Sequence, residues 1–279
     1  MKALVQAEAG APRSRPRELA LALWRYRGFV LSMVQRELRQ RYAQSFLGSL
    51  WNVIHPLTLI LVYTLVFSQV MRSRLPGMEL RFGYSIYLCA GLLPWTLFSA
   101  SLDRGVGVFV EQANLIKKVN FPRVTLPLIV QLSALVDFAI IFGIYSAFLL
   151  AIGWFPGWPL LAMIPLLLIQ QALSAAIGLL LGCLNVYIRD TKQVVGIVLQ
   201  FWFWFTPVVY ASAALPERAA RILRWNPVWP LFNAYHELFL HRAFPGFQGI
   251  WLPIACALAF GALGAAAYRS LAPGMTDEL

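Results

Sequence analysis

Long apolar stretches separated by short polar segments dominate the chain. The hydrocarbon core of a bilayer requires about 20 apolar residues per helix, and six stretches reach that length. The sequence therefore predicts an all-α integral membrane protein with six transmembrane helices. The predicted spans are residues 50–70, 82–102, 124–151, 160–184, 194–213 and 250–268.

A shorter periodic segment precedes the first span. Its apolar residues recur at steps of three and four, at Leu31, Val34, Leu38 and Tyr42. This spacing predicts an amphipathic helix, with arginines on its other face. We expect the helix to lie in the headgroup layer or to present the same face to a partner protein. Residues 1–49 then form a cytoplasmic N-terminal segment, and residues 50–279 form the six-span domain.

The last outer connection, residues 214–249, is unusually apolar for a segment outside a span. It contains two apolar stretches, 227–235 and 237–244, and both are too short to cross a bilayer. Short helical segments at membrane depth are tolerated where they are buried against protein or line a wet cavity. We therefore expect re-entrant or interfacial helices in this outer element.

The composition excludes an ordinary soluble domain. Hydrophobic residues make up 59% of the 279 residues and charged residues only 13%, and the mean hydropathy is +0.67. The net charge of +11 does not indicate nucleic-acid binding, because the basic residues lie between apolar stretches. Cys89, Cys183 and Cys256 lie within apolar runs without paired spacing, so we expect them to pack rather than form disulfides.

The distribution of Lys and Arg predicts the orientation. Sixteen of the 23 basic residues lie in the N-terminal segment, in the connections after the second and fourth spans, or at the C-terminus. Because Lys and Arg gather on the cytoplasmic side, both termini are expected to be cytoplasmic.

The sequence gives little support to catalysis or metal binding. The twelve acidic residues are scattered, and His55, His236 and His241 share no metal-binding spacing. The chain also lacks the G-x-x-x-x-G-K-[ST] motif, since no glycine is followed by lysine. We expect no cofactor on this chain, and any ATP would be hydrolysed by a partner.

Asp137 is the acidic residue predicted deepest within a span. An ionisable group there is expensive and is a functional candidate by default. Ser133 lies one turn earlier and could join it in hydrogen bonds between helices, whereas the sequence offers no Lys or Arg inside a span as its partner. An ion-driven secondary transporter that uses Asp137 is therefore the alternative function.

Five consecutive aromatic residues, 201–205, begin about seven residues inside the fifth predicted span. Aromatic belts lie near span ends, so this position favours either core packing or a translocation path. Aromatic faces could stack on the C–H groups of sugars without fixing one position. The candidate pathway residues are Phe201, Trp202, Phe205, Tyr210, Trp95 and Phe98.

Four stretches resemble the ABC-2 type permeases, and specifically the subfamily that exports polysaccharides and polyol phosphates. They are residues 45–56 (SFLGSLWNVIHP), 113–123 (ANLIKKVNFPR), 185–190 (NVYIRD) and the segment from Asn226-Pro227 onward. The second stretch is the most specific. His236 is a departure, because the resemblance leads us to expect an arginine there.

The resemblance implies a bacterial inner-membrane exporter. This chain would form a homodimer with two copies of a separate P-loop ATPase, which would carry ATP and Mg. The substrate would be a lipid-linked polysaccharide such as O-antigen, capsule or teichoic acid. A membrane glycosyltransferase or acyltransferase ranks last, because Asp103, Glu111 and Asp190 are spread over two predicted connections and offer little basis for it.

The resemblance also implies which residues meet the ATPase. These are the N-terminal helix and the loop before the third span, and the alternative is that their basic residues only anchor the chain at the membrane surface. The candidate coupling residues are Lys117, Lys118, Asn120, Phe121, Pro122, Arg123, Arg36 and Arg39.

Overall fold

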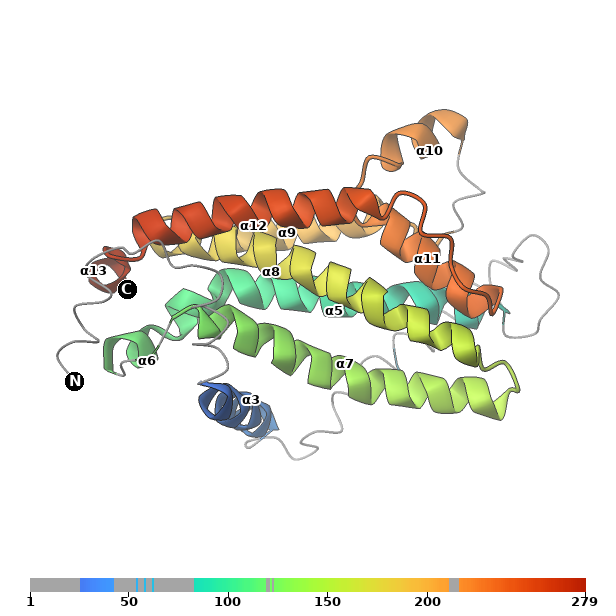
Figure 1. Ribbon diagram of the computed structural model, residues 1–279, viewed down its shortest axis with the longest axis horizontal. Coiled ribbons are helices and arrows are strands. Elements are labelled where there is room, and N and C mark those ends of the chain that lie inside the picture. Colours follow the sequence, from blue (N-terminus) through green and yellow to red (C-terminus); the bar gives the residue numbers. More distant parts are fainter. Residues whose placement is uncertain are drawn as a thin grey trace.

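The computed structural model describes residues 26–42, 54, 58, 62, 83–118, 121, 123–210 and 216–279. Within these ranges the elements are helices, arranged as a bundle (Figure 1). They are α3 (Arg27–Tyr42), α5 (Gly83–Glu111), α6 (Ala113–Lys118), α7 (Thr125–Ala151), the 3-10 helix η3 (Trp158–Ala162), α8 (Met163–Tyr187), α9 (Thr191–Trp204), α10 (Glu217–Leu223), α11 (Trp229–Leu240), α12 (Trp251–Leu271) and α13 (Met275–Glu278).

Four helices in the described residues are long and apolar enough to cross a membrane: α5, α7, η3 with α8, and α12. They correspond to the second, third, fourth and sixth predicted spans. The α5 helix runs nine residues past the predicted end at Leu102, so its 29 residues extend about 43 Å against a hydrocarbon core of about 30 Å. The first predicted span lies outside the described residues except for positions 54, 58 and 62.

The fifth predicted span was wrong in its extent. The α9 helix has 14 residues and ends at Trp204, so it is about 21 Å long and too short to cross a bilayer alone. Pro207 accounts for the early end, because it lacks an N–H group and disfavours helical backbone at Thr206. The Asn226 side chain then caps the turn, donating through Nδ2 to the Phe205 carbonyl at 3.0 Å.

The bundle is built around α8, which packs against both α5 and α12. Small residues permit the close contact with α5. A Cβ atom added to Gly178 would lie 3.3 Å from the Gly105 Cα, and one added to Gly182 would lie 2.8 Å from the Gly105 carbonyl oxygen. This small-residue contact, with glycines four apart on α8, is the usual means of bringing membrane helices together.

Buried amides and hydroxyls also join the spans. The Gln131 Oε1 atom of α7 accepts hydrogen bonds from Gln171 Nε2 at 3.0 Å and from Ser174 Oγ at 3.1 Å, both on α8. Gln171 Nε2 also donates to Ser101 Oγ of α5 at 3.3 Å. The four side chains connect three helices within an apolar core and fix their register.

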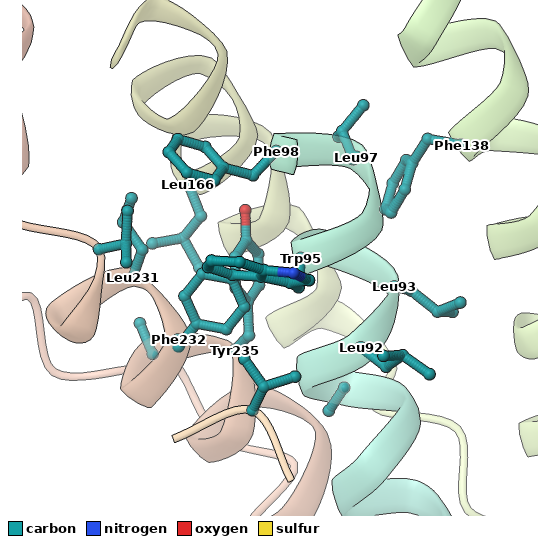
Figure 2. Close-up of a cluster of buried hydrophobic side chains, with 14 of the residues drawn as sticks. Leu92, Leu93, Trp95, Leu97, Phe98, Phe138, Leu166, Leu231, Phe232 and Tyr235 are labelled. Carbon is teal, nitrogen blue, oxygen red and sulfur yellow. The ribbon is translucent and has the colours of Figure 1, made fainter. Parts of the chain in front are cut away.

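The two apolar stretches of the outer element were predicted to form short re-entrant or interfacial helices. The structure instead has one buried helix there, α11. In α11, one continuous helix covers most of residues 227–244, and Leu231, Phe232 and Tyr235 are fully buried. Figure 2 shows these side chains grouped around Trp95 of α5, whose ring centroid lies 5.8 Å from that of Phe232. The α11 helix is therefore part of the hydrophobic core.

Candidate functional site

The α3 helix packs across α7 at one end of the bundle (Figure 1). Val30 and Val34 are 3% and 7% exposed, while Leu31, assigned by the sequence pattern to the same stripe as Val34, is 63% exposed. The face that contacts the protein is therefore centred on Val30 and Val34, one helical turn apart. Phe29 extends this contact to Phe121, with ring centroids 5.2 Å apart.

A cluster of charged side chains joins α3 to the spans beneath it. The Arg104 guanidinium donates to the Glu37 carboxylate, and its Nη1 atom lies 3.8 Å from Asp137 Oδ2. Ser133 Oγ donates to the other Glu37 oxygen at 2.8 Å. Since these side chains are 18–29% exposed where they form ion pairs, their charges are partly withdrawn from water and stabilised mainly by one another.

The predicted lack of a basic partner for Asp137 was wrong. Arg104 was assigned to a connection, but it belongs to α5, because that helix continues to Glu111. Asp137 lies twelve residues into α7, about 18 Å from the helix start, and the long arginine side chain bridges the remaining separation. Ser133 does form a hydrogen bond between helices, and its partner is Glu37 of α3.

A cavity of about 290 Å³ adjoins this cluster, between α3, α5, α6 and α7. Its polar lining includes Arg36, Glu37, Arg104, Glu111, Asn114 and Lys118. Charged groups of both signs therefore line this cavity where the four helices meet.

The predicted coupling residues occupy different environments at this end. Lys117 and Lys118 are exposed on α6, Phe121 is 8% exposed, and Arg123 donates through Nη1 to the Ala272 carbonyl at 2.9 Å. Arg36 is exposed and lines the cavity. The remaining candidates, Asn120, Pro122 and the Arg39 side chain, lie outside what the structure describes.

The connection between α8 and α9 is bonded to α5 at the end of the bundle that carries α6. The sequence analysis did not predict this role. Asn185 Nδ2 donates to the Val106 carbonyl of α5 at 3.1 Å, and Asn185 Oδ1 accepts from the Lys192 backbone N–H at 3.2 Å. Lys192 Nζ donates to Glu111 Oε1 at 2.5 Å, and this hydrogen bond raises the lysine pKa. Asn185 of the motif, together with Lys192 just after it, thus ties the start of α9 to the last turns of α5.

The candidate pathway aromatics divide into two groups. Trp95 and Phe98 are 6% and 0% exposed in the core, where Phe98 meets Trp202 edge-to-face with centroids 5.4 Å apart. Phe201 and Phe205 are 63% and 56% exposed on the outside of α9. The half-buried Tyr210, beyond the end of α9, donates through its hydroxyl to the Trp204 carbonyl at 2.9 Å.

His236 has a packing role on α11. Its ring stacks on Tyr87 with centroids 3.9 Å apart and an interplanar angle of 10°. Gly91 makes room for it, because a Cβ atom there would lie 2.9 Å from His236 Nε2. The described residues contain no group of three His, Cys, Asp or Glu side chains placed to bind a metal ion.

Comparisons with known proteins identify the class of this membrane bundle. Residues 29–240 match the description "ABC-2 type transporter". The chain belongs to the ABC-2 type transporter family. It is 34% identical over 229 residues to the O-antigen export system permease protein RfbA of Myxococcus xanthus, covering 81% of this chain and 86% of the relative.

Two further relatives of this ABC-2 chain are export proteins. The O-antigen export system permease protein RfbA of Klebsiella pneumoniae is 30% identical over 75% of this chain and 79% of its own length. The polysialic acid transport protein KpsM of Escherichia coli is 24% identical over 71% of this chain and 76% of its own length.

Apart from the first two residues of α3, the family match covers every described element from α3 to α11, which includes the charged cluster and both aromatic groups. Members of the ABC-2 family are membrane transport subunits, and the four long apolar helices fit that role. The chain is therefore a multi-pass membrane subunit of a transporter. Its α12 and α13 helices lie beyond the matched residues.

Proposed function

We propose that this chain is the permease subunit of an ATP-driven exporter that moves a lipid-linked polysaccharide, such as O-antigen or a capsular polysaccharide, across the bacterial cytoplasmic membrane. The likeness to the O-antigen permease of M. xanthus, which extends over most of both chains, is the observation that carries this proposal. Two copies would pair in the membrane with two copies of a separate ATPase. Both termini would be cytoplasmic, in accord with the distribution of Lys and Arg.

The partner would supply the energy, because the chain has no P-loop motif to hold ATP and Mg. Its contact surface would be α6, with the exposed Lys117 and Lys118, together with the exposed face of α3 around Arg36. Closure of the ATPase on ATP would push both elements. The stacked Phe29 and Phe121 would make them move together.

The charged cluster would carry this movement into the membrane. Arg104 lies on α5, while its two carboxylate partners lie on α3 and α7, so a shift of α3 changes the balance of forces on both spans. The polar cavity beside the cluster would offer α3 space for such a shift.

The substrate path would lie along the exposed face of α9. Phe201 and Phe205 would contact the sugar chain, while the buried Trp95 and Phe98 and the partly buried Trp202 would hold α9 rigid from behind. Each ring would bind weakly, because a conduit that binds one state tightly stalls. A second copy of the chain would close the path from the opposite side.

The ion-driven carrier is not favoured by any observation. Asp137 pairs with Arg104, whereas a carrier of coupling charge must exchange its ion with both sides. The relatives named above are export permeases and polysaccharide transport proteins.

Purification of the chain from its native membrane in mild detergent tests the proposal. We expect a P-loop ATPase to copurify in equal amount, and the reconstituted complex to export lipid-linked polysaccharide on ATP addition. Deletion of the gene should remove the polysaccharide from the cell surface and leave it in the cytoplasm. Recovery of the chain alone, with transport driven by a proton gradient, would reject the proposal in favour of the ion-driven carrier.

A further inference from the structure

A cleft of about 890 Å³ opens at the end of the bundle opposite α3 and α6. It lies where α10, α11 and the start of α12 meet, with α10 standing away from the other helices (Figure 1). Its volume is within the range of about 300–1,000 Å³ typical of small-molecule sites. Neither the coupling elements nor the candidate pathway residues line it.

Three tryptophans from different elements converge on this cleft. Trp229, at the start of α11, is 8% exposed, whereas Trp225 and Trp251 are 74% and 65% exposed. The two exposed indoles therefore offer flat apolar faces to a ligand, and the buried Trp229 forms part of the wall. Tryptophans that only anchor a protein at the membrane surface face lipid around its perimeter, whereas these share one hollow.

Hydrogen-bonding groups line the same cleft. Asn233, Gln248 and Glu237 line the cleft from α11 and from the loop that follows it, Arg221 lines it from α10, and Arg224 lines it from the turn after α10. Amides, a carboxylate and guanidinium groups can donate to and accept from several hydroxyl groups at once. Such a mixture around exposed aromatic faces suits a ligand with apolar ring faces and a polar edge.

The wall of the cleft is fixed by internal bonds. Glu237 Oε1 accepts from Asn233 Nδ2 at 3.1 Å, and Glu237 Oε2 accepts from the Gly246 backbone N–H at 2.9 Å. Gly249 has a φ of 79° and packs against Pro230, where a Cβ atom would lie 3.3 Å from the proline Cγ. The loop is thereby held against α11, which reduces the ordering cost of binding.

We propose that this cleft binds a short stretch of glycan on the outer face of the membrane. Sugar rings would stack on Trp225 and Trp251, while Asn233, Gln248 and the two arginines would bind ring hydroxyls. The inference rests on the proposed function, and it adds an outward-facing sugar site to it. The site would retain the emerging chain and oppose its return.

Binding to the permease alone tests the cleft. The full chain is placed in nanodiscs of phosphatidylcholine and titrated with short oligosaccharides released from the surface polysaccharide of the bacterium that encodes it. Calorimetry and tryptophan fluorescence measure the affinity. We expect W225A and W251A each to weaken binding at least tenfold, and the conservative W225F and W251F to retain most of it.

Trp158 provides a matched control. It is 79% exposed in η3, on a different connection at the same end of the bundle, so W158A should bind within twofold of the wild type. Equal affinity in W225A and W251A, or no oligosaccharide binding by the wild type, would overturn the proposal. A second set of discs, made with phosphatidylglycerol added, tests a lipid ligand: the proposal would also be overturned if W225A and W251A lost binding of that lipid and not of the sugar.

The outcome is separable from the proposed function. If the complex exports polysaccharide although its permease binds no free oligosaccharide, the glycan site in the cleft is rejected and the exporter function is retained. If the permease binds oligosaccharide through these tryptophans but the complex exports no polysaccharide, the exporter function is rejected and the glycan site is retained.

Discussion

Nη1 of Arg104 on α5 lies 3.8 Å from Oδ2 of Asp137 on α7, and the same guanidinium binds Glu37 of α3. One cation therefore serves two carboxylates from two helices. Its removal would leave both acids close together and partly desolvated, which is more costly than the loss of one exposed ion pair.

We predict that R104Q lowers the free energy of unfolding by about 1–3 kcal/mol, the cost of leaving partly buried polar groups without a partner. Denaturation in detergent, followed by tryptophan fluorescence, measures the change. R104K retains the charge and should lose less. The triple variant E37Q/R104Q/D137N should recover part of the loss, since it removes the stranded charges; wild-type stability in R104Q would show that the cluster contributes nothing.

The exposed basic residues of α6 should affect coupling and leave stability unchanged. We expect K117Q/K118Q to reduce ATP-dependent export at least tenfold while ATP hydrolysis continues, because the partner would no longer push α6. The ratio of transported substrate to hydrolysed ATP in proteoliposomes measures this. R269Q, which alters an exposed arginine in the last turn of α12, is the control, and an equal effect there would indicate a general membrane-anchoring role.

The two aromatic groups on α9 should respond differently to truncation. F201A and F205A remove exposed rings, so we expect unfolding free energies within about 0.5 kcal/mol of the wild type but a clear loss of export. W202A should lose about 3 kcal/mol, because Trp202 packs on Phe98 and donates to Asn226 Oδ1 at 2.8 Å. Export assays and unfolding curves of the three variants separate these roles.

A control from α12 completes that comparison. Leu258 is 70% exposed on a different helix, and L258A should change neither stability nor export. Normal export in F201A and F205A would remove the aromatic path from the proposed mechanism.

We expect a Cβ atom added at the close contact between α5 and α8 to destabilise the protein. G182A places a Cβ atom 2.8 Å from the Gly105 carbonyl oxygen, and we expect it to cost about 1–3 kcal/mol through forced separation of the helices. G143A on α7 is the matched control, since a Cβ atom there meets nothing within 4 Å. Thermal melting in one detergent compares the two, and equal melting temperatures would contradict the packing argument.

Sequence patterns located α7, α8 and α12 well because long apolar runs there end at charged residues or prolines. They failed at α9, where an apolar run continues through Pro207 although the helix does not. Pro207 indicated that the helix ends there, but the prediction followed the high hydropathy of the run instead. The length of α5 was missed for the converse reason, since Arg104 and Glu111 are charged and still helical.

The partner of Asp137 could not be derived from sequence spacing. The pair joins residues 33 positions apart on different helices, and its existence depends on how α5 and α7 pack. The same holds for the cleft, whose tryptophans come from three separate segments. In contrast, the motif at Asn185 was recognised, and only its role in binding α5 and α9 required the structure.

The contact between Gly105 and Gly182 also has a mechanical meaning. It places a fulcrum inside α5, about 9 Å from the Glu111 end and about 15 Å from Trp95. If this part of α5 tilts as a stiff rod, each ångström of displacement at Glu111 moves Trp95 by about 1.7 Å in the opposite direction. A small displacement at the α6 end would thus produce a larger displacement, in the opposite direction, in the aromatic core.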